Sequence, residues 1–493
     1  MIAAHLPILQ IVLPLLAAPL CVLIRPQKLV WPFVLLVSWA TLGLAAMMLD
    51  QVLTSGPISY ALGGWEAPWG IEYRIDLLNA YVILLVALIG AVVVTYAPAS
   101  VAHEIDADRR PYFYAAFMLC LTGLLGICIT GDAFNVFVFL EISSLSTYGL
   151  ISLGRDRRAL TAAYNYLILG TIGATFILIA IGLMYMMTGT LNMADLASRL
   201  PAVNHTRTVH MAFAFLSVGI TLKLALFPLH IWLPNAYTYA PSVVTAFIAA
   251  TATKVSVYLF LRFVFTIFGA DYAFATIHLN AILVPLAIAG ILVASTVAIY
   301  QTDLKRLLAY SSIAQIGYIM LGIGMGTVTG LTAGIAHIFN HALMKCALFM
   351  IVGCIVLRLG SSRLEDMAGI GRRMPATSFA FVLGGFALIG VPLTVGFISK
   401  WYLLLGALEQ GWWPVAVLVL LSSLLAAVYI WRFVEVAYFR SPPADAPPLA
   451  APPLSMQIPI WSLLAATLFF GVQTDLTAGI AQRAALWLLA GGP

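Results

Sequence analysis

Apolar segments long enough to cross a lipid bilayer follow one another along the whole chain. A transmembrane helix needs about 20 apolar residues, and short polar loops separate the runs. The residues after the last run, up to Leu489, either extend the final span or form a helix at the membrane surface. We therefore expect an all-α polytopic membrane protein with about fourteen transmembrane helices. The predicted spans are 5–24, 29–49, 77–99, 112–130, 133–154, 160–187, 209–230, 242–268, 277–299, 307–325, 329–357, 375–405, 412–438 and 457–474.

Composition agrees with this pattern. The 493 residues are 62% hydrophobic and 9% charged, which leaves no room for a soluble domain. The N-terminal stretch is apolar from Leu6 but lacks the basic start and the cleavage site of a signal peptide, so we expect it to be the first span. All five cysteines fall within predicted spans, where we expect them to serve as small apolar packing residues.

Basic residues in alternate loops predict the orientation in the membrane. One set of loops holds Arg25, Lys28, Arg109, Arg110, Arg155, Arg157, Arg158, Lys305, Arg306, Arg358, Arg363, Arg372, Arg373 and Arg440. The opposite loops hold Arg74, Arg199, Arg207 and Arg483. Because arginine and lysine collect in cytoplasmic loops, we expect both termini on the non-cytoplasmic side.

Polar residues interrupt the apolar segment from Leu222 to Tyr237, which reads KLALFPLHIWLPNAY after its leading leucine. Lys223 is expected deep in the bilayer, where a charge costs roughly 2.5–3.5 kcal/mol on insertion scales. Pro228 and Pro234 each remove a backbone donor, which predicts a helix broken just past the lysine. Broken helices at membrane depth line a wet or protein-filled cavity.

A faint internal repeat divides the chain. Thr130–Gly149 opens one span much as Gln301–Tyr318 opens another, about 170 residues further on. Lys223 and Lys400 recur at a similar separation, and a proline and a glycine shortly precede Lys400. Two broken helices in corresponding halves indicate a transport site. Because an odd number of spans separates the copies, we expect the second copy to be inverted in the membrane.

Titratable residues inside the predicted spans are the candidate functional groups. Glu141 lies about two and a half turns into the fifth span, and we pair it with Lys223. If the two side chains are close, both stay charged, and separating them releases a proton, which makes the pair a switch. The alternative is a static ion pair that joins two helices.

Further lysines and histidines extend this series. His337, His341 and Lys345 are spaced by four residues, which places them on one helix face, about 6 Å apart per step. Together with Lys254 and Lys400, this face predicts a proton relay. The alternatives are histidines that serve packing through hydrogen bonds, and a haem or metal site, for which carboxylate and cysteine ligands are lacking nearby.

Two other polar residues leave alternatives open. His230 follows the predicted break and either links one half-channel to the next or is an interfacial residue. Asp132 either takes part in transport or caps the fifth helix. The sequence contains no phosphate-binding loop, dinucleotide fingerprint, zinc-protease motif or nucleophile elbow, so nothing in it indicates a soluble enzyme or ATP hydrolysis by this chain.

Four motifs together resemble a known family. GDAFNVFVFLE, KLALFPLHIWLPNAY, the HxxxHxxxK face and GFISKW are similar to those of the antiporter-like membrane subunits shared by Mrp-type cation/proton antiporters, respiratory complex I and membrane-bound hydrogenases. The resemblance implies fourteen helices, broken helices seven and twelve, and two inverted five-helix repeats. The implied parts are helices 1–3 at 1–111, the first repeat at 112–269, the second repeat at 270–440, and a C-terminal helix and tail at 441–493.

The resemblance also implies roles for the candidate residues. Glu141 and Lys223 would be the ion pair, Lys254 the central lysine, and Lys400 the terminal lysine at the exit, with His337, His341 and Lys345 between them. Lys400 and the short C-terminal tail resemble the D-subunit type of Mrp antiporter in particular. Asn165 departs from the pattern, since related chains often have a lysine near that position.

From this resemblance we expect a proton-translocating subunit of a multi-subunit sodium or potassium/proton antiporter in the bacterial inner membrane. We expect no cofactor and no bound metal, protons and sodium or potassium as cargo, other membrane subunits and the lipid bilayer as partners, and no contact with nucleic acid. The alternative is a non-redox, proton-pumping subunit of a complex I-like NADH dehydrogenase or membrane-bound hydrogenase.

Overall fold

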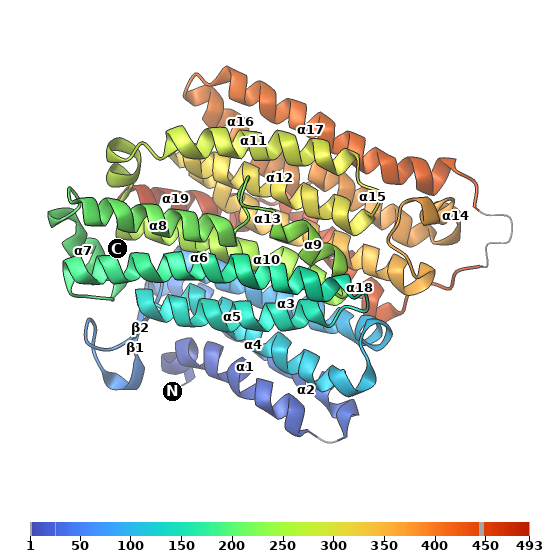
Figure 1. Cartoon of the computed structure of the whole chain (residues 1–493), viewed down its shortest axis with the longest axis horizontal. Coiled ribbons are helices and arrows are strands. Elements are labelled where there is room, and N and C mark those ends of the chain that lie inside the picture. The colour runs from blue at the N-terminus through green and yellow to red at the C-terminus, as the bar shows by residue number, and fades with distance from the viewer. Residues whose placement is uncertain (1, 25, 443–447, 493) are drawn as a thin grey trace.

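The chain forms a bundle of long, roughly parallel helices in a computed structural model that describes residues 2–24, 26–442 and 448–492 (Figure 1). Twelve helical segments in the described residues are long and apolar enough to cross a membrane. Their α-helical parts are α1 (Leu6–Leu23), α2 (Val30–Ser55), α3 (Leu77–Glu104), α4 (Arg110–Ile129), α5 (Ala133–Ser152), α6 (Arg158–Thr188), α10 (Ser242–Leu261), α11 (Asn280–Ile299), α12 (Leu304–Gly324), α13 (Val328–Leu359), α17 (Trp413–Val434) and α18 (Leu454–Val472).

Two more crossings are broken helices. The first consists of α8 (Arg207–Lys223) and α9 (Trp232–Tyr239), and the second of α15 (Pro375–Ile389) and α16 (Val395–Glu409). With these, the described residues make the fourteen crossings that the hydropathy pattern predicts. The predicted bounds were wrong at the breaks, because the seventh span ends as a helix at Lys223 and not at residue 230, and 375–405 is not one continuous helix.

Short elements close the two ends of the bundle. At one end lie α7 (Met193–Arg199) and a hairpin of β1 (Ile58–Ala61) and β2 (Glu72–Ile75), antiparallel with Ile58 opposite Ile75. At the other end lies α14 (Ile370–Arg373) (Figure 1). The remaining turns are 3-10 or π-helical: Ile2–His5, Gln27–Leu29, Leu62–Gly64, Ala107–Arg109, Leu200–Ala202, Arg262–Ile267, Tyr272–Thr276, Glu365–Met367, Glu435–Phe439 and Asp475–Gly479.

The C-terminal segment does not extend the last span. A π-helical turn at Asp475–Gly479 separates α18 from α19 (Ile480–Leu489), which packs on α13 and α3 through a buried face. The segment is therefore a separate helix and not an extension of the final span. Both ends of the chain lie at the same end of the bundle (Figure 1), as an even number of crossings requires.

The two repeats share a backbone junction that is inverted between them. Asp132 and Asp303 each accept a hydrogen bond in the first turn of the helix that follows, from Asn135 N at 2.7 Å and Arg306 N at 3.0 Å, so each is an N-cap. Asp132 forms a β-bridge with Asn192, and Asp303 forms one with Arg363. The first junction adjoins α7 and the second lies near α14, at opposite ends of the bundle (Figure 1).

Each helix break exposes backbone carbonyls that need partners, because the last turn of a helix has none within the helix. At the first break Ala225 has a positive φ of 61°, and Trp232 Nε1 donates to Leu222 O at 3.0 Å. At the second break Leu393 has a φ of 73°. A non-glycine residue in this region costs free energy, so both breaks are held in place by the surrounding packing.

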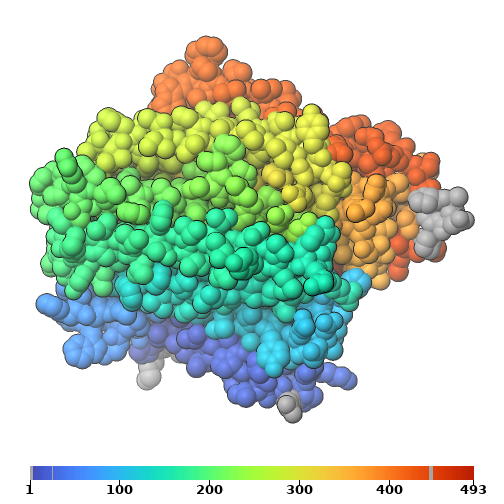
Figure 2. Space-filling model, in the orientation of Figure 1, coloured from blue at the N-terminus to red at the C-terminus, as the bar shows by residue number. Residues whose placement is uncertain are grey.

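α13 lies at the centre of the bundle, and α6 lies on its outside. The middle of α13, from Gly330 to Ile355, is buried among α3, α10, α12, α15, α16 and α18. On the outside, Leu160, Tyr164 and Met186 of α6 are exposed. These exposed apolar side chains give α6 an outer face suited to lipid or to another membrane subunit, and α6 forms part of the broad teal band in Figure 2.

Candidate functional site

Lys223 is the last residue of α8, at the first helix break, and is buried. Its Nζ donates to Ser144 Oγ on α5 at 2.8 Å. Glu141 lies one turn before Ser144 on α5, is half-buried, and its Oε1 has no hydrogen-bond partner in the described part of the chain. The expected direct ion pair between Glu141 and Lys223 is therefore not formed here, because Ser144 takes the ammonium group instead.

A small cavity surrounds this lysine. Its polar walls come from Ser143, Ser144 and Thr147 of α5, Tyr166 of α6 and Ser256 of α10. Tyr166 stacks on Trp232 with ring centroids 3.8 Å apart, which fixes the start of α9 against α6. The cavity thus extends from the first break towards α10, the helix that carries the next lysine.

Lys254 is buried near the middle of α10, where its Nζ donates to Ala249 O at 2.5 Å and Thr253 Oγ1 at 3.3 Å. Both acceptors belong to α10 itself and precede Lys254 in the chain. Lys345 of α13 donates to Leu308 O at 2.8 Å and to Ser311 Oγ. None of the described carboxylates forms an ion pair with Lys254, Lys345 or Lys400.

The two histidines of α13 lie one turn apart with nearly parallel rings, 5.8 Å between centroids and 13° between planes. His337 uses both nitrogens, with Nδ1 2.6 Å from Ser399 Oγ and Nε2 2.8 Å from Gln315 Oε1. His341 is buried and neither of its nitrogens has a partner among the described residues. Buried polar groups usually have a hydrogen-bond partner, either in the protein or in ordered water.

Lys400 lies on α16, just after the second break. Its Nζ donates to Leu388 O at 3.1 Å and Ile389 O at 2.9 Å, the carbonyl groups that α15 leaves free, and to Ser423 Oγ of α17 at 2.9 Å. The ammonium group also lies 4.7 Å from the ring centroid of Tyr318. Tyr318 in turn contacts His337 edge-on at 5.9 Å, so it joins Lys400 to the histidine pair.

These groups form a row across the bundle. Lys223, Lys254, the three residues of α13, and Lys400 lie on α8, α10, α13 and α16, and each of these helices packs on the next. The helices lie side by side across the bundle, so the row runs at right angles to their length (Figure 1). His230 lies outside the row, half-buried between α8 and α9 and stacked on Phe227 at 5.3 Å, and its Nδ1 has no partner among the described residues.

Sequence reasoning missed the neutral partners of this row. They are Ser144, Ser311, Gln315, Tyr318, Ser399 and Ser423. Serine pairs inside the predicted spans, in EISSLS, AYSSIAQ and LLSSLL, are a visible signal, but small hydroxyl residues also occur in membrane helices for packing alone. Arg262, inside the predicted eighth span, was also missed.

Comparisons with known proteins agree with this architecture. The family described as NADH:quinone oxidoreductase/Mrp antiporter, TM, matches residues 130–426. The chain is 42% identical to the N subunit of NADH-quinone oxidoreductase from Desulforudis audaxviator, over 99% of each chain. It is 29% identical to the D subunit of the Na(+)/H(+) antiporter from Bacillus subtilis, over 98% of this chain and 97% of the relative.

Two solved structures have the same fold. A chain of the archaeal membrane-bound sulfane sulfur reductase has a TM-score of 0.90 and 32% identity, covering 98% of both chains. A chain of the Mrp complex from Dietzia has a TM-score of 0.89 and 25% identity, covering 99% of this chain and 98% of the other. From its sequence and its fold alike, the chain is a member of the NADH:quinone oxidoreductase/Mrp antiporter family of membrane proteins.

Proposed function

We propose that this chain is the proton-translocating subunit of a multi-subunit antiporter that exchanges sodium or potassium ions for protons. One observation carries the proposal: a row of buried lysines and histidines, drawn from both repeats, crosses the bundle with almost no buried carboxylate beside it. Charged groups at membrane depth are costly, so a row of them is retained for transport and not for stability.

The row supports proton movement in short steps. Each ammonium or imidazole group can take up and release one proton, and a charge on one group disfavours a charge on its neighbour. The neutral partners, such as Ser144 and Gln315, are hydrogen-bonding groups that hold each member without fixing its charge. Hydration of His341 would complete the path through α13.

Glu141 is the acid of the switch in this proposal. Ser144 and Glu141 lie one turn apart on α5, so a change of side-chain rotamer can carry the Lys223 ammonium from the hydroxyl to the carboxylate. The ion pair would then be one of two states and not a permanent contact. Lys400, held by the carbonyl groups of the second break, is the proposed exit group.

We place the protein in a bacterial inner membrane, within a hetero-oligomer, with both termini on the non-cytoplasmic side. The relatives include the Mrp complex of Dietzia and the antiporter chain of Bacillus subtilis, which supports the assembly and the exchange of sodium for protons. The four parts predicted at 1–111, 112–269, 270–440 and 441–493 stay a prediction, as does the absence of a cofactor.

A second candidate is a proton-pumping subunit of a redox-driven membrane complex. A specific observation favours it: the 42% identical relative is named as the N subunit of NADH-quinone oxidoreductase, and the sulfane sulfur reductase chain is more similar in sequence than the Mrp chain. The same row of residues would serve in both, with electron transfer in other subunits as the driving force.

The test uses inverted membrane vesicles from an antiporter-deficient bacterial host that expresses the chain with its neighbouring genes. Sodium or potassium should collapse a preformed proton gradient, and the Glu141→Ala variant should not respond. If neither cation acts, and proton pumping requires a reductant such as NADH, the chain belongs to the redox-driven class.

A further inference from the structure

A groove at the end of the bundle opposite the chain termini lies outside the proposed relay. It has a volume of about 360 Å³ and lies between the turn that joins α1 to α2 and the turn that joins α3 to α4 (Figure 1). Its polar walls come from Gln27, Lys28, Arg110 and Tyr114. Small-molecule sites in proteins commonly have volumes of about 300–1,000 Å³, so the groove is large enough to hold a ligand.

Main-chain carbonyl groups hold Arg110 at the mouth of α4. Its Nε donates to Ile105 O at 3.2 Å and its Nη2 donates to Ala102 O at 3.0 Å, both at the end of the third crossing. The residue is half-buried, and its Nη1 forms no hydrogen bond with the described residues. The guanidinium group is therefore fixed in position while its charge and one of its nitrogens stay available to a ligand.

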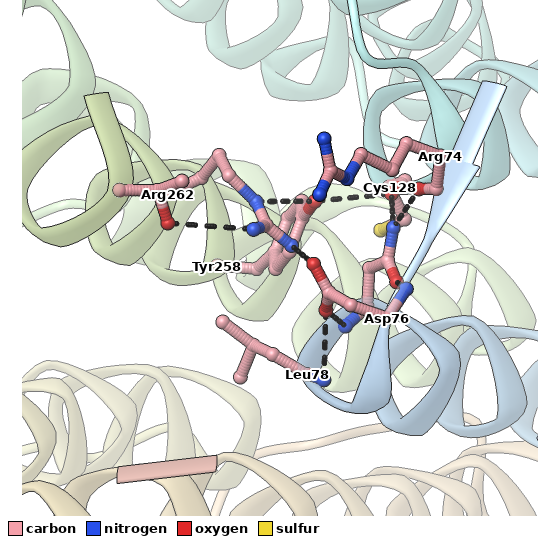
Figure 3. A network of polar contacts seen from close by, with 8 residues as sticks. Arg74, Asp76, Leu78, Cys128, Tyr258 and Arg262 are labelled. Carbon is pink, nitrogen blue, oxygen red and sulfur yellow. Dashed lines mark hydrogen bonds and ion pairs between the residues drawn. The ribbon is translucent and has the colours of Figure 1, made fainter. Parts of the chain in front are cut away.

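No carboxylate neutralises this groove. None of the described acidic residues lines it, and neither Lys28 nor Arg110 forms an ion pair with a described carboxylate. Arg262, at the opposite end of the bundle, shows the contrast, because its guanidinium group is paired with Asp76 at 2.6 Å (Figure 3). The groove therefore keeps an uncompensated positive charge, which attracts an anion.

The hydroxyl group of Tyr114 lacks a partner in the same groove. Tyr114 lies one turn after Arg110 on α4, is 5% exposed, and packs edge-on against Phe113 with 5.0 Å between the ring centroids. It lines the groove, and its hydroxyl forms no hydrogen bond with the described residues. Buried hydroxyl groups usually have a hydrogen-bond partner. An anionic oxygen that lies between this hydroxyl and the guanidinium group would accept from both.

The other walls of the groove are apolar. Val30 and Trp31 begin α2, and Pro98 and Val101 belong to the last two turns of α3. Trp31 Nε1 donates to Val94 O at 3.0 Å, which holds the indole ring against α3. Tryptophan and tyrosine are enriched where a bilayer meets water, and basic pockets between crossing helices bind anionic lipid headgroups. An anion site beside an apolar wall at the end of crossing helices suits a phospholipid better than a free ion.

We propose that the groove binds the phosphodiester headgroup of one anionic phospholipid, such as phosphatidylglycerol, from the membrane leaflet at this end of the bundle. Arg110 and Tyr114 donate hydrogen bonds to the phosphate oxygens, and Lys28 approaches from the exposed side. The acyl chains leave along the apolar wall into the bilayer. The site is separate from the relay, so the proposal does not depend on how transport is driven.

The first test uses the full complex in detergent and a phosphatidylglycerol analogue with a photoreactive group on its headgroup. The probe should label the peptides that contain Lys28 or Arg110. Unmodified phosphatidylglycerol should compete at a concentration about tenfold lower than phosphatidylcholine with the same acyl chains, because the choline group would lie beside Lys28. Glycerol phosphate carries the same anion without acyl chains and should not compete at these concentrations.

Three outcomes of this test would each overturn the proposal. Equal competition by phosphatidylcholine would show that the groove does not select an anionic lipid. Competition by glycerol phosphate at the same concentration as phosphatidylglycerol would show a site for a soluble anion. Absence of label from these peptides would show that another subunit covers the groove.

A second test removes the proposed contacts one at a time and measures the probe concentration that gives half-maximal labelling. Arg110→Gln should raise this concentration about tenfold, and Tyr114→Phe, which removes one oxygen atom, should raise it about threefold. The matched control is Arg109→Gln, because Arg109 is exposed, precedes Arg110 and does not line the groove. Tyr114→Phe keeps the test informative if Arg110→Gln fails to assemble. An assembled variant of either residue that labels like the control would contradict the lipid site.

Discussion

Lys223 and Ser144 are joined by a 2.8 Å hydrogen bond between α8 and α5, and this bond takes the place of the expected ion pair. The nearby carboxylate of Glu141 is left with an oxygen that has no partner among the described residues. Glu141 is half-buried at this position, one turn from Ser144 on the same helix. In the proposed switch, this contact is one state, and the other state pairs the two charges.

Removing either charge of this switch should stop transport. Glu141→Ala and Lys223→Ala are each expected to lower cation-driven proton transport at least tenfold while the complex still assembles, because each removes one of the two charges that the switch needs. Ser146→Ala is the control, because Ser146 bonds only to Ile142 O of its own helix at 2.7 Å. Transport that survives either charge removal would rule out the switch.

Ser144→Ala tests the second state directly. Without the hydroxyl, the ammonium group of Lys223 loses a hydrogen bond and should turn to Glu141. Hydrogen bonds to charged groups contribute about 1.5–3 kcal/mol, so the balance between the two states should shift more than tenfold. We expect transport to slow several-fold without being abolished, measured as the initial rate of gradient collapse. A loss as complete as in Lys223→Ala would instead make Ser144 an essential member of the relay.

The spans were predictable because the bilayer sets their length and apolar character. The breaks were predictable because proline interrupts a helix. Helices of about 20 apolar residues are required by the membrane, and Pro228 and Pro392 lie in the two breaks, where a residue without a backbone N–H interrupts the helix. The partners of the lysines were not predictable, because Lys400 bonds to two main-chain carbonyls that only the break makes available. Nor could an arginine at the end of an apolar span reveal that its partner is Asp76, 186 residues away.

Lys400 should tolerate a carboxyl group better than an apolar residue. A glutamic acid in its protonated form can donate to Leu388 O or Ile389 O, and it can still exchange a proton. We expect Lys400→Glu to retain at least three times the transport rate of Lys400→Ala, in the same vesicle assay. Equal and complete loss in both variants would show that the positive charge itself is required.

Gln315 should control the proton on His337. Its Oε1 lies 2.8 Å from His337 Nε2, so Gln315→Leu leaves a buried imidazole nitrogen unpaired, at a cost of about 1–3 kcal/mol. Gln315→Glu puts a carboxylate beside the imidazole and should trap the proton there. Both changes are expected to slow transport at least fivefold, and an unchanged rate in the glutamate variant would remove His337 from the path.

The second break should depend on the absence of a side chain at position 396. A Cβ atom at Gly396 would collide with the main-chain oxygen of Ala387, so Gly396→Ala must push α16 away from α15. Lys400 lies one turn further along α16, and its contacts with Leu388 O would be lost with this movement. Destabilising substitutions of this kind cost about 1–3 kcal/mol, which should lower the melting temperature of the purified complex by several degrees.

Gly182→Ala is the matched control for this change. Gly182 lies inside α6 with no atom within 4 Å of the added Cβ, and alanine is the better helix former by about 1 kcal/mol. Its complex should melt at the same temperature or slightly higher, with full transport. If Gly396→Ala behaves like Gly182→Ala in both measurements, the close packing of α15 and α16 does not position Lys400.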